Sequence, residues 1–452
     1  MSKIVPNKFI PPSSKIAVDS LKDIKLERVR LYPQAHANTT YSPSGLNRIS
    51  FRIPAYANSM LDNSRSFLSF KLKMTESGST LTNSNNAVFG NGLPIFNRIL
   101  IKNSAGLVLE DISNFNVLSK ILLCVSEEED YRVDKGVYGT SEAPSTVGAQ
   151  LIPSANGIVY TYQFNTGILS KDLSAYLPLF MMDSNGGYAI DLEMFLQDNT
   201  CISVNNASVG ADVSYELTEP VYNLCLLRMD QSLCSKFNEI SCDPNSTIEI
   251  PFTTFKCHTA TIQSQTNVVQ ISENASNLKR VWSVYLDQNQ TRGTSYTSPP
   301  KSVIPFRGSV NEASGSKVVK YNYRVGSTYI YNEPVQETVN NNISLQYVKD
   351  ALWGMKRPMI LSKTNSDKTA TLYQSDQKFF TVGNFEYSEE AMNPAVISGI
   401  SSTLPVQLEF TLDSTPGSAI VNHNFCEVGY TMSVRNGVVS YLEPKPGSQS
   451  VY

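Results

Sequence analysis

The sequence predicts an all-β protein built from two similar units in tandem, and three observations support this prediction. Apolar and polar residues alternate along many short segments, only two segments have the apolar spacing of a helix, and features of the first half return in the second half. Alternation with a period of two is typical of strands that bury one face. We therefore expect antiparallel sheets packed face to face around an apolar core.

The alternating segments occur throughout the chain. The clearest are residues 48–53, 68–74, 99–109, 188–196 and 213–217 in the first half, and 282–286, 319–325, 406–412 and 428–434 in the second. The last one runs into Asn436-Gly437, a pair that favours a tight hairpin turn, and the chain continues through Val438. In the first segment we expect Ile49, Phe51 and Ile53 to face the core.

Two segments have the spacing of amphipathic helices. The first follows Ser113, a candidate N-cap, and the second follows Ser344 and ends at Gly354. These two helices begin about half the chain length apart. The segments 190–196 and 406–412 resemble each other at a similar offset. Both offsets indicate a duplicated unit.

Composition limits the classes of function that the chain can have. Of its 452 residues 41% are hydrophobic and only 17% are charged, whereas roughly 25% are charged in an average soluble protein. Much of the polar surface is therefore uncharged, as expected of a large protein that buries surface against other subunits. The net charge of −3 gives no overall attraction to nucleic acid or to an anionic membrane.

Segments that would direct the chain to a membrane or a secretory route are not evident. The longest apolar run, residues 121–125, is far shorter than a transmembrane span. The first twelve residues are interrupted by Lys3, Pro6 and Lys8, so we expect no signal peptide. The seven cysteines form no C-x-x-C pair, and this pattern predicts free thiols in a reducing compartment.

Catalytic and metal-binding motifs are nearly absent from the sequence. The three histidines, His36, His258 and His423, are far apart, and Cys257 and His258 would point to opposite faces of a strand. H-E-x-x-H, G-x-S-x-G and phosphate-binding glycine motifs are missing. The acidic run 127–130 is typical of a solvated face. We therefore expect no enzyme activity, no metal, no cofactor and no sequence-specific binding of nucleic acid.

Several stretches, taken in order, carry a resemblance to a known family. They are residues 47–54, 61–68, 94–103, 177–180, 188–196, 215–226 and 275–281. Together they resemble the double jelly-roll major capsid proteins of tailless icosahedral DNA viruses, the adenovirus-like lineage. The resemblance is nearest to the capsid proteins of virophages, polinton-like viruses and large eukaryotic DNA viruses. It matches residues 215–226 to the last strand of the first jelly roll and residues 275–281 to the opening of the second.

The resemblance implies a fold, a division into domains and a function. The fold is all-β, with two tandem jelly-roll sandwiches and a few short helices. The domains are an N-terminal arm at residues 1–28, a first jelly roll at 29–232, and a second jelly roll with a C-terminal tail at 233–452. The function is that of a major capsid protein whose homotrimers form pseudo-hexagonal capsomers and tile an icosahedral shell.

The same resemblance implies partners and a location. The partners are the chain itself, neighbouring capsomers, minor capsid proteins and penton proteins. The location is the virion, after synthesis and assembly in the host cytoplasm or nucleus. A minor capsid or spike protein with one jelly roll is an alternative function, and a carbohydrate-binding adhesion sandwich is another.

The N-terminal arm is the candidate assembly element. Its five lysines are Lys3, Lys8, Lys15, Lys22 and Lys25. Pro6, Pro11 and Pro12 keep this segment extended. In the resembled family such arms run along the inner base of the capsomer, so this arm could meet a neighbouring trimer, minor proteins or an inner membrane. The alternative is a disordered tail without a role.

Overall fold

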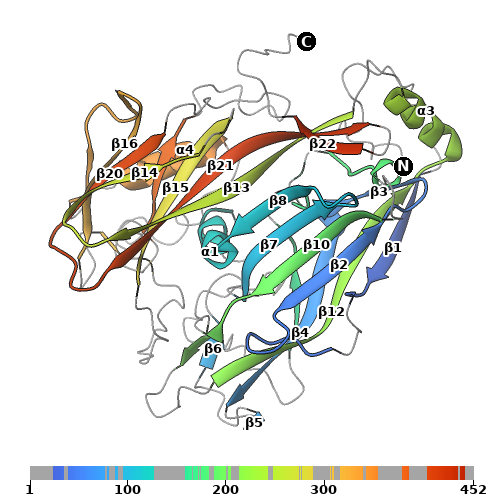
Figure 1. The fold of residues 1–452 in the computed structure, drawn as a ribbon, viewed down its shortest axis with the longest axis horizontal. Helices are drawn as coiled ribbons and strands as arrows, with labels where there is room; N and C mark the ends of the chain where they lie inside the picture. Colours follow the sequence, from blue (N-terminus) through green and yellow to red (C-terminus); the bar gives the residue numbers. More distant parts are fainter. Residues whose placement is uncertain are drawn as a thin grey trace.

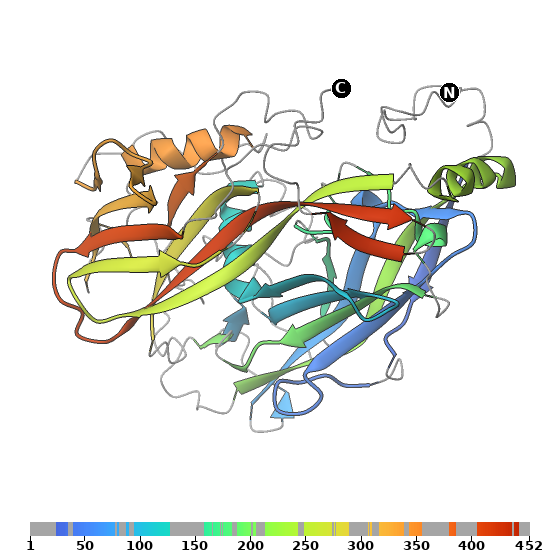
Figure 2. The same ribbon diagram turned by 45° about the horizontal axis from the view of Figure 1, so that its top comes forward.

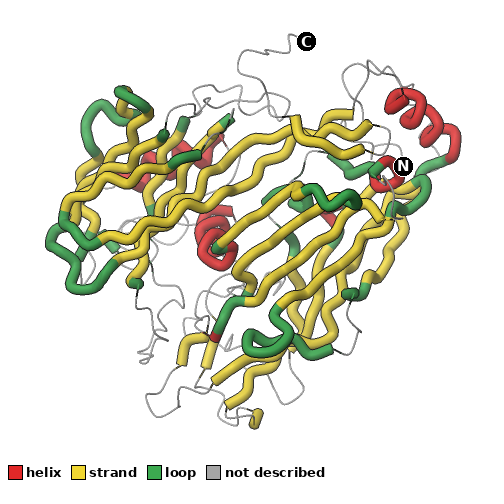
Figure 3. The backbone as a smooth tube through the Cα atoms, in the orientation of Figure 1, coloured by secondary structure: helices red, strands yellow, loops and turns green. Residues whose placement is uncertain are grey.

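The computed structural model contains two β-sandwiches that lie side by side (Figures 1 and 2). It describes residues 24–442 except 35–38, 77–78, 81–86, 90–94, 127–157, 165, 172, 174, 183–187, 200–201, 205–212, 243–247, 274, 276, 289–305, 307, 310–315, 339–342, 355–378, 386–404 and 436–437. Strands predominate, and the helices are short (Figure 3).

The first sandwich has the strand order of a jelly roll. One sheet runs β1 (Lys25–Leu31), β12 (Val213–Arg228), β4 (Phe67–Glu76) and β9 (Ile158–Tyr162), with β3 (Ser59–Leu61) on β12 and β5 (Ser79–Thr80) on β4. The facing sheet runs β2 (Arg48–Pro54), β10 (Tyr188–Leu196), β7 (Phe96–Asn103) and β8 (Val108–Ser113). A separate small sheet pairs β6 (Ala87–Phe89) with β11 (Ile202–Val204).

The second sandwich repeats this order. One sheet runs β13 (Ile248–Ile262), β21 (Ile420–Arg435), β15 (Leu278–Asp287) and β19 (Thr381–Asn384), with β22 (Val438–Leu442) on β21. The other runs β14 (Thr266–Ile271), β20 (Val406–Leu412), β16 (Val318–Val325) and β17 (Thr328–Tyr329), with β18 (Val335–Gln336) on β16. The resembling segments 190–196 and 406–412 are β10 and β20, which hold the same place in the two sheets. The predicted fold class is confirmed.

Two helices hold equivalent places in the two sandwiches. Helix α1 (Phe115–Ser126) joins β8 to β9, and α4 (Ile343–Gly354) joins β18 to β19. Both predicted caps are wrong, however. Ser113 ends β8, and the chain turns instead at Asn114, whose φ of 52° lies in the left-handed region. Ser344 lies inside α4, where its hydroxyl donates to Glu337.

A third helix, α3 (Gln231–Cys242), was not predicted. The side chain of Asp230 accepts hydrogen bonds from the backbone N–H of Ser232 at 3.4 Å and from its hydroxyl, as an N-cap does. Leu233 and Phe237, one turn apart, are buried. The predicted division between residues 232 and 233 falls within this helix. The division itself stays a prediction.

The resemblance placed the opening of the second jelly roll too late. Residues 275–281 lead into β15, but β13 and β14 precede them in the second sandwich. By its place before β15, this stretch corresponds to the connection into β4 of the first unit, since β15 pairs with β21 as β4 pairs with β12. In the first unit that connection contains the 3₁₀ helix η3 (Asn63–Arg65), which begins where the Asp62 carboxylate accepts from the Ser64 N–H at 3.0 Å.

The apolar core lies between the two sheets of each sandwich. Ile49, Phe51 and Ile53 are buried, as the alternation predicted. In the second sandwich Trp282 and Tyr323 are among the largest fully buried side chains. A second 3₁₀ helix, η4 (Leu179–Met181), closes the first core beneath β10. Burial of each such side chain contributes about 1.5–3 kcal/mol to folding.

Candidate functional site

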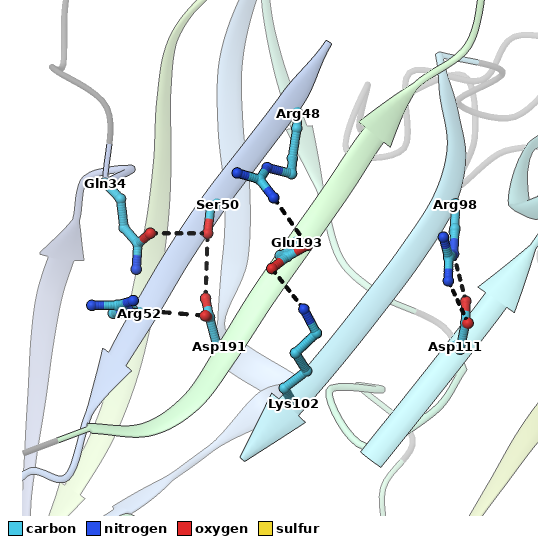
Figure 4. A network of polar contacts seen from close by, with 9 residues as sticks. All are labelled: Gln34, Arg48, Ser50, Arg52, Arg98, Lys102, Asp111, Asp191 and Glu193. Carbon is cyan, nitrogen blue, oxygen red and sulfur yellow. Dashed lines mark hydrogen bonds and ion pairs between the residues drawn. The ribbon is translucent and has the colours of Figure 1, made fainter. Parts of the chain in front are cut away.

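Two regions bring together side chains from distant parts of the chain. One is the contact between the sandwiches, formed by β8 and residues 166–168 of the first unit against β13 of the second, which we call the seam. The other is the outer face of the sheet β2–β10–β7–β8 (Figure 4).

At the centre of the seam lies a buried carboxylate, Glu110 of β8. One oxygen accepts a hydrogen bond from the Thr254 hydroxyl of β13 at 2.5 Å, and the other accepts from the Ile168 N–H at 3.1 Å. The residue is only 4% exposed. Burial raises the pKa of Glu110 to about 7, because desolvation outweighs the two hydrogen bonds that favour the charged form.

The backbone of Gly167 covers this carboxylate. Its φ is 80°, and a Cβ at this position would lie 2.1 Å from the Glu110 carboxylate oxygens. Its N–H donates to the Thr253 carbonyl of β13 at 3.1 Å. Only glycine allows this conformation and this close approach together. The loop therefore holds the acid of one unit against the strand of the other.

Further polar contacts cross between the units on either side of Glu110. The Asn114 amide donates to the Cys257 sulfur at 3.4 Å, and the Asn103 amide donates to the Val439 carbonyl at 3.3 Å. These directional contacts come from three separate elements of the first unit. They fix the orientation of one sandwich relative to the other, rather than merely burying apolar area.

The outer face of β2–β10–β7–β8 carries a ladder of ion pairs (Figure 4). On the central strand β10, Glu193 binds Arg48 at 3.7 Å and Lys102 at 3.0 Å from the strands on either side. Asp191 binds Arg52 at 3.9 Å. The two acidic side chains are only 10% and 14% exposed, whereas both arginine side chains are 55% exposed.

The cations of the ladder are therefore more exposed than its acids. At the edge of the sheet Arg98 donates to both oxygens of Asp111, at 2.7 and 2.6 Å. Ion pairs at a solvent-exposed face contribute about 0.2–1 kcal/mol each. The ladder therefore matters more for the charge pattern of this face than for the stability of the sheet.

Among the residues screened for chemistry, Cys257 lies at the seam, where its sulfur accepts from the Asn114 amide. His258 contacts Glu273 at 2.9 Å, and Cys257, its neighbour, lies 3.9 Å from Nδ1 of His423. Burial lowers the pKa of His423 to about 4. His36 lies outside the described residues. Within the described ranges no group of three His, Cys, Asp or Glu side chains could hold a metal ion.

The described cysteines form no disulfide with one another: Cys225, Cys234, Cys257 and Cys426 are free thiols. No helix in the described part of the chain is long and apolar enough to cross a membrane.

The candidate lysines of the arm are placed only at its end. Lys25 is the first residue of β1, where it lies opposite Arg228, so it belongs to the sheet. Lys3, Lys8, Lys15 and Lys22 lie outside the described residues. Their role in assembly stays a prediction.

Sequence reasoning missed the residues of the seam. The signal that could have found Glu110 is an acid within the apolar strand 108–112. A shift in the β7–β8 register between Ile101 and Lys102 buries both Leu109 and Glu110, which follow each other in the sequence. A strict period of two cannot reveal such a position.

Comparisons with known proteins agree on the fold. No family model and no curated protein matches the sequence. Among solved structures, PBCV-1 VP54 fitted into a reconstruction of the virophage Sputnik matches with a TM-score of 0.60 and 9% identity, over 94% of this chain and 97% of that one. The chain has the double jelly-roll fold.

Other double jelly-roll proteins match over similar lengths. The Faustovirus major capsid protein matches with a TM-score of 0.55 and 9% identity, over 95% of this chain and 92% of that one. The structure of the Sputnik virophage matches with a TM-score of 0.53 and 10% identity, over 96% and 91%. The likeness thus extends over both jelly rolls of the chain.

Proposed function

We propose that the chain is the major capsid protein of a tailless icosahedral DNA virus. One observation carries the proposal: two jelly rolls with the same strand order are joined at a polar seam and span nearly the full length of viral capsid chains. The role is structural and needs no cofactor. The low charge fraction of 17% suits a protein that buries much of its polar surface against copies of itself.

In this role three copies form a pseudo-hexagonal capsomer. Each copy supplies two similar sandwiches held at a fixed orientation by the seam, so three copies supply six similar parts around one axis. The capsomers then tile a shell with neighbouring capsomers, and with minor capsid and penton proteins. The basic arm is the candidate contact with those partners or with an inner membrane. The protein acts in the virion, after assembly in the host cytoplasm or nucleus.

The alternative functions have less support. A spike with one jelly roll and a receptor domain does not fit two sandwiches of matching order. No observation on the described surface favours a carbohydrate-binding adhesion role over a capsid role.

The proposal is tested by the mass and shape of the purified full-length chain. Light scattering should give three times the 49.9 kDa of one chain, and negative-stain images should show particles of hexagonal outline. A monomer or dimer at micromolar concentration would contradict the capsomer. Binding to a glycan array, combined with such a result, would favour the adhesion function.

A further inference from the structure

The seam joins two sheet edges of different kinds. β8 is the outer strand of β2–β10–β7–β8, and β13 is the outer strand of β13–β21–β15–β19. By matched sheet order, the counterpart of β8 in the second unit is β17 with β18, and the counterpart of β13 in the first unit is β1. Figures 1 and 2 place β1 and β16, which carries β17 and β18, at opposite ends of the molecule.

The hairpin register matches Tyr329 to Glu110. In the first unit the β7–β8 hairpin closes with Lys102 opposite Val108, and the next pair joins Ile101 to Glu110. In the second unit the β16–β17 hairpin closes with Val325 opposite Thr328, and the next pair joins Arg324 to Tyr329. Counted from the turn, Tyr329 thus lies in the second pair of its hairpin, as Glu110 does, but it is 42% exposed, whereas Glu110 is buried. Its hydroxyl donates to Glu409 at 3.3 Å, and the Arg324 guanidinium lies 5.6 Å from its ring centroid.

A similar register matches Arg30 to Thr254. Thr254 lies opposite Val428 of β21, which also faces Leu278, the first residue of β15. In the first unit Arg30 lies opposite Asn223 of β12, and Asn223 also faces Phe67, the first residue of β4. The residue that holds the seam from the β13 side therefore has an arginine counterpart on β1.

The two outer edges are chemically complementary. β1 is exposed along most of its length, including Arg28, Arg30 and Leu26, the last 45% exposed. At the other edge Glu333, which lies between β17 and β18, is exposed. Within the described residues no ion pair holds Arg28, Arg30 or Glu333. The β1 edge thus carries two cations without an ion pair, and the β17–β18 edge carries an acid without one.

We propose that β1 of one copy packs against the β17–β18 edge of a second copy, and so repeats between chains the contact that β13 makes with β8 within one chain. The contact brings Arg30 to Tyr329 and places the β1 arginines within reach of Glu333. It is head-to-tail, because different surfaces meet, so each copy can bind one further copy at each end until a ring closes. The inference rests on the proposed capsomer and names the surface that forms it.

Charge reversal on the full-length chain tests the contact. Arg30→Glu and Glu333→Arg should each raise the protein concentration at which trimers dissociate by about tenfold or more, since like charges then meet. The double variant exchanges the two charges and should return to within about threefold of the wild type. Lys236→Glu, an exposed reversal on α3, is the matched control and should leave the trimer unchanged.

Cross-linking tests the direction of the contact without relying on charge. Arg30→Cys and Tyr329→Cys variants should each fail to form disulfide-linked pairs alone and should form them when mixed, because the proposed contact brings these two positions together. Linked pairs of Arg30→Cys alone would mean a symmetric contact and would overturn the proposal. The test also applies if Arg30→Glu fails to fold, since the cysteine variant introduces no charge.

The outcomes separate this inference from the proposed function. Trimers that tolerate both single charge reversals, and that give no cross-link in the mixture, would show that copies meet at another surface. That result would overturn the inference and leave the capsomer intact. A wild-type chain that stays monomeric would overturn both.

Discussion

Glu110 is a carboxylate buried between neutral groups. Thr254 faces it from β13, and the backbone of Ile168 and Gly167 faces it from the loop after β9. Burial is the largest cause of its raised pKa, and no charged side chain within the described residues contributes to that rise. The folded state therefore holds the Glu110 proton more tightly than the unfolded chain does.

This burial makes stability depend on pH. Because the folded pKa of about 7 lies above the ordinary value of 4.5, the contribution of Glu110 is complete below pH 4.5 and is lost as the pH rises through 7, up to about 3 kcal/mol. Glu110→Gln should flatten this dependence, which melting temperatures at pH 5 and pH 8 would measure. Glu249→Gln, an exposed change on β13, is the control. Equal slopes in all three proteins would contradict the prediction.

A second buried acid, Glu427, differs because it is paired. Arg280 donates to one oxygen at 2.9 Å and the Trp282 indole N–H donates to the other at 3.0 Å, and both charged residues are almost fully buried. Arg280→Met should cost about 3–5 kcal/mol, since it removes the cation that binds this buried charge directly and leaves only the weaker attraction of Lys279. Adding Glu427→Gln, which removes the charge and keeps an acceptor for Trp282, should recover most of that loss in urea denaturation. A double variant as unstable as the single would count against the explanation.

At the scale of elements, the loop that covers Glu110 depends on one glycine. Gly167 and Gly106 both have φ near 80°, but a Cβ at Gly106 meets nothing within 4 Å, whereas a Cβ at Gly167 meets the Glu110 carboxylate. Gly106→Ala should cost about 1–2 kcal/mol from backbone strain alone, and Gly167→Ala should cost clearly more. Thermal unfolding of the two variants measures the difference. Equal losses would mean that the seam adapts to the extra methyl group.

The strands could be predicted from the sequence because each buries one face. Alternation located β2, β10 and β20, and the pairing of Arg435 with Val438 confirms the hairpin predicted at residues 436–437. Helix α3 was missed because its apolar residues are few, although Asp230 gives a capping signal. The element boundaries near Ser113 and Ser344 depend on a backbone turn at Asn114 and on a side-chain contact with Glu337. Composition and period do not encode either feature.

At the scale of the whole molecule, the seam could not be predicted because it joins residues far apart in the sequence. Nothing local distinguishes Thr254, whose role exists only when β13 lies beside β8. The duplicated fold, in contrast, follows from patterns that each unit repeats. A sequence of this kind therefore predicts its sandwiches and leaves open how they are joined, which is the feature that decides whether copies can form a closed ring.

The basic arm and the strand β1 meet at Lys25. Lys25 belongs to β1, and Arg30 lies on the same strand, so a deletion that tests the arm must stop before residue 24. Deleting residues 1–22 should leave trimers folded, with an unchanged melting temperature, but should lower the yield and salt tolerance of assembled shells. The reason is that each of the four lysines removed contributes at most about 1 kcal/mol near an anionic surface, less at higher salt. Deleting residues 1–31 also removes β1 and should abolish trimers. Shells of normal yield and salt tolerance from the shorter deletion would show that the arm has no part in assembly.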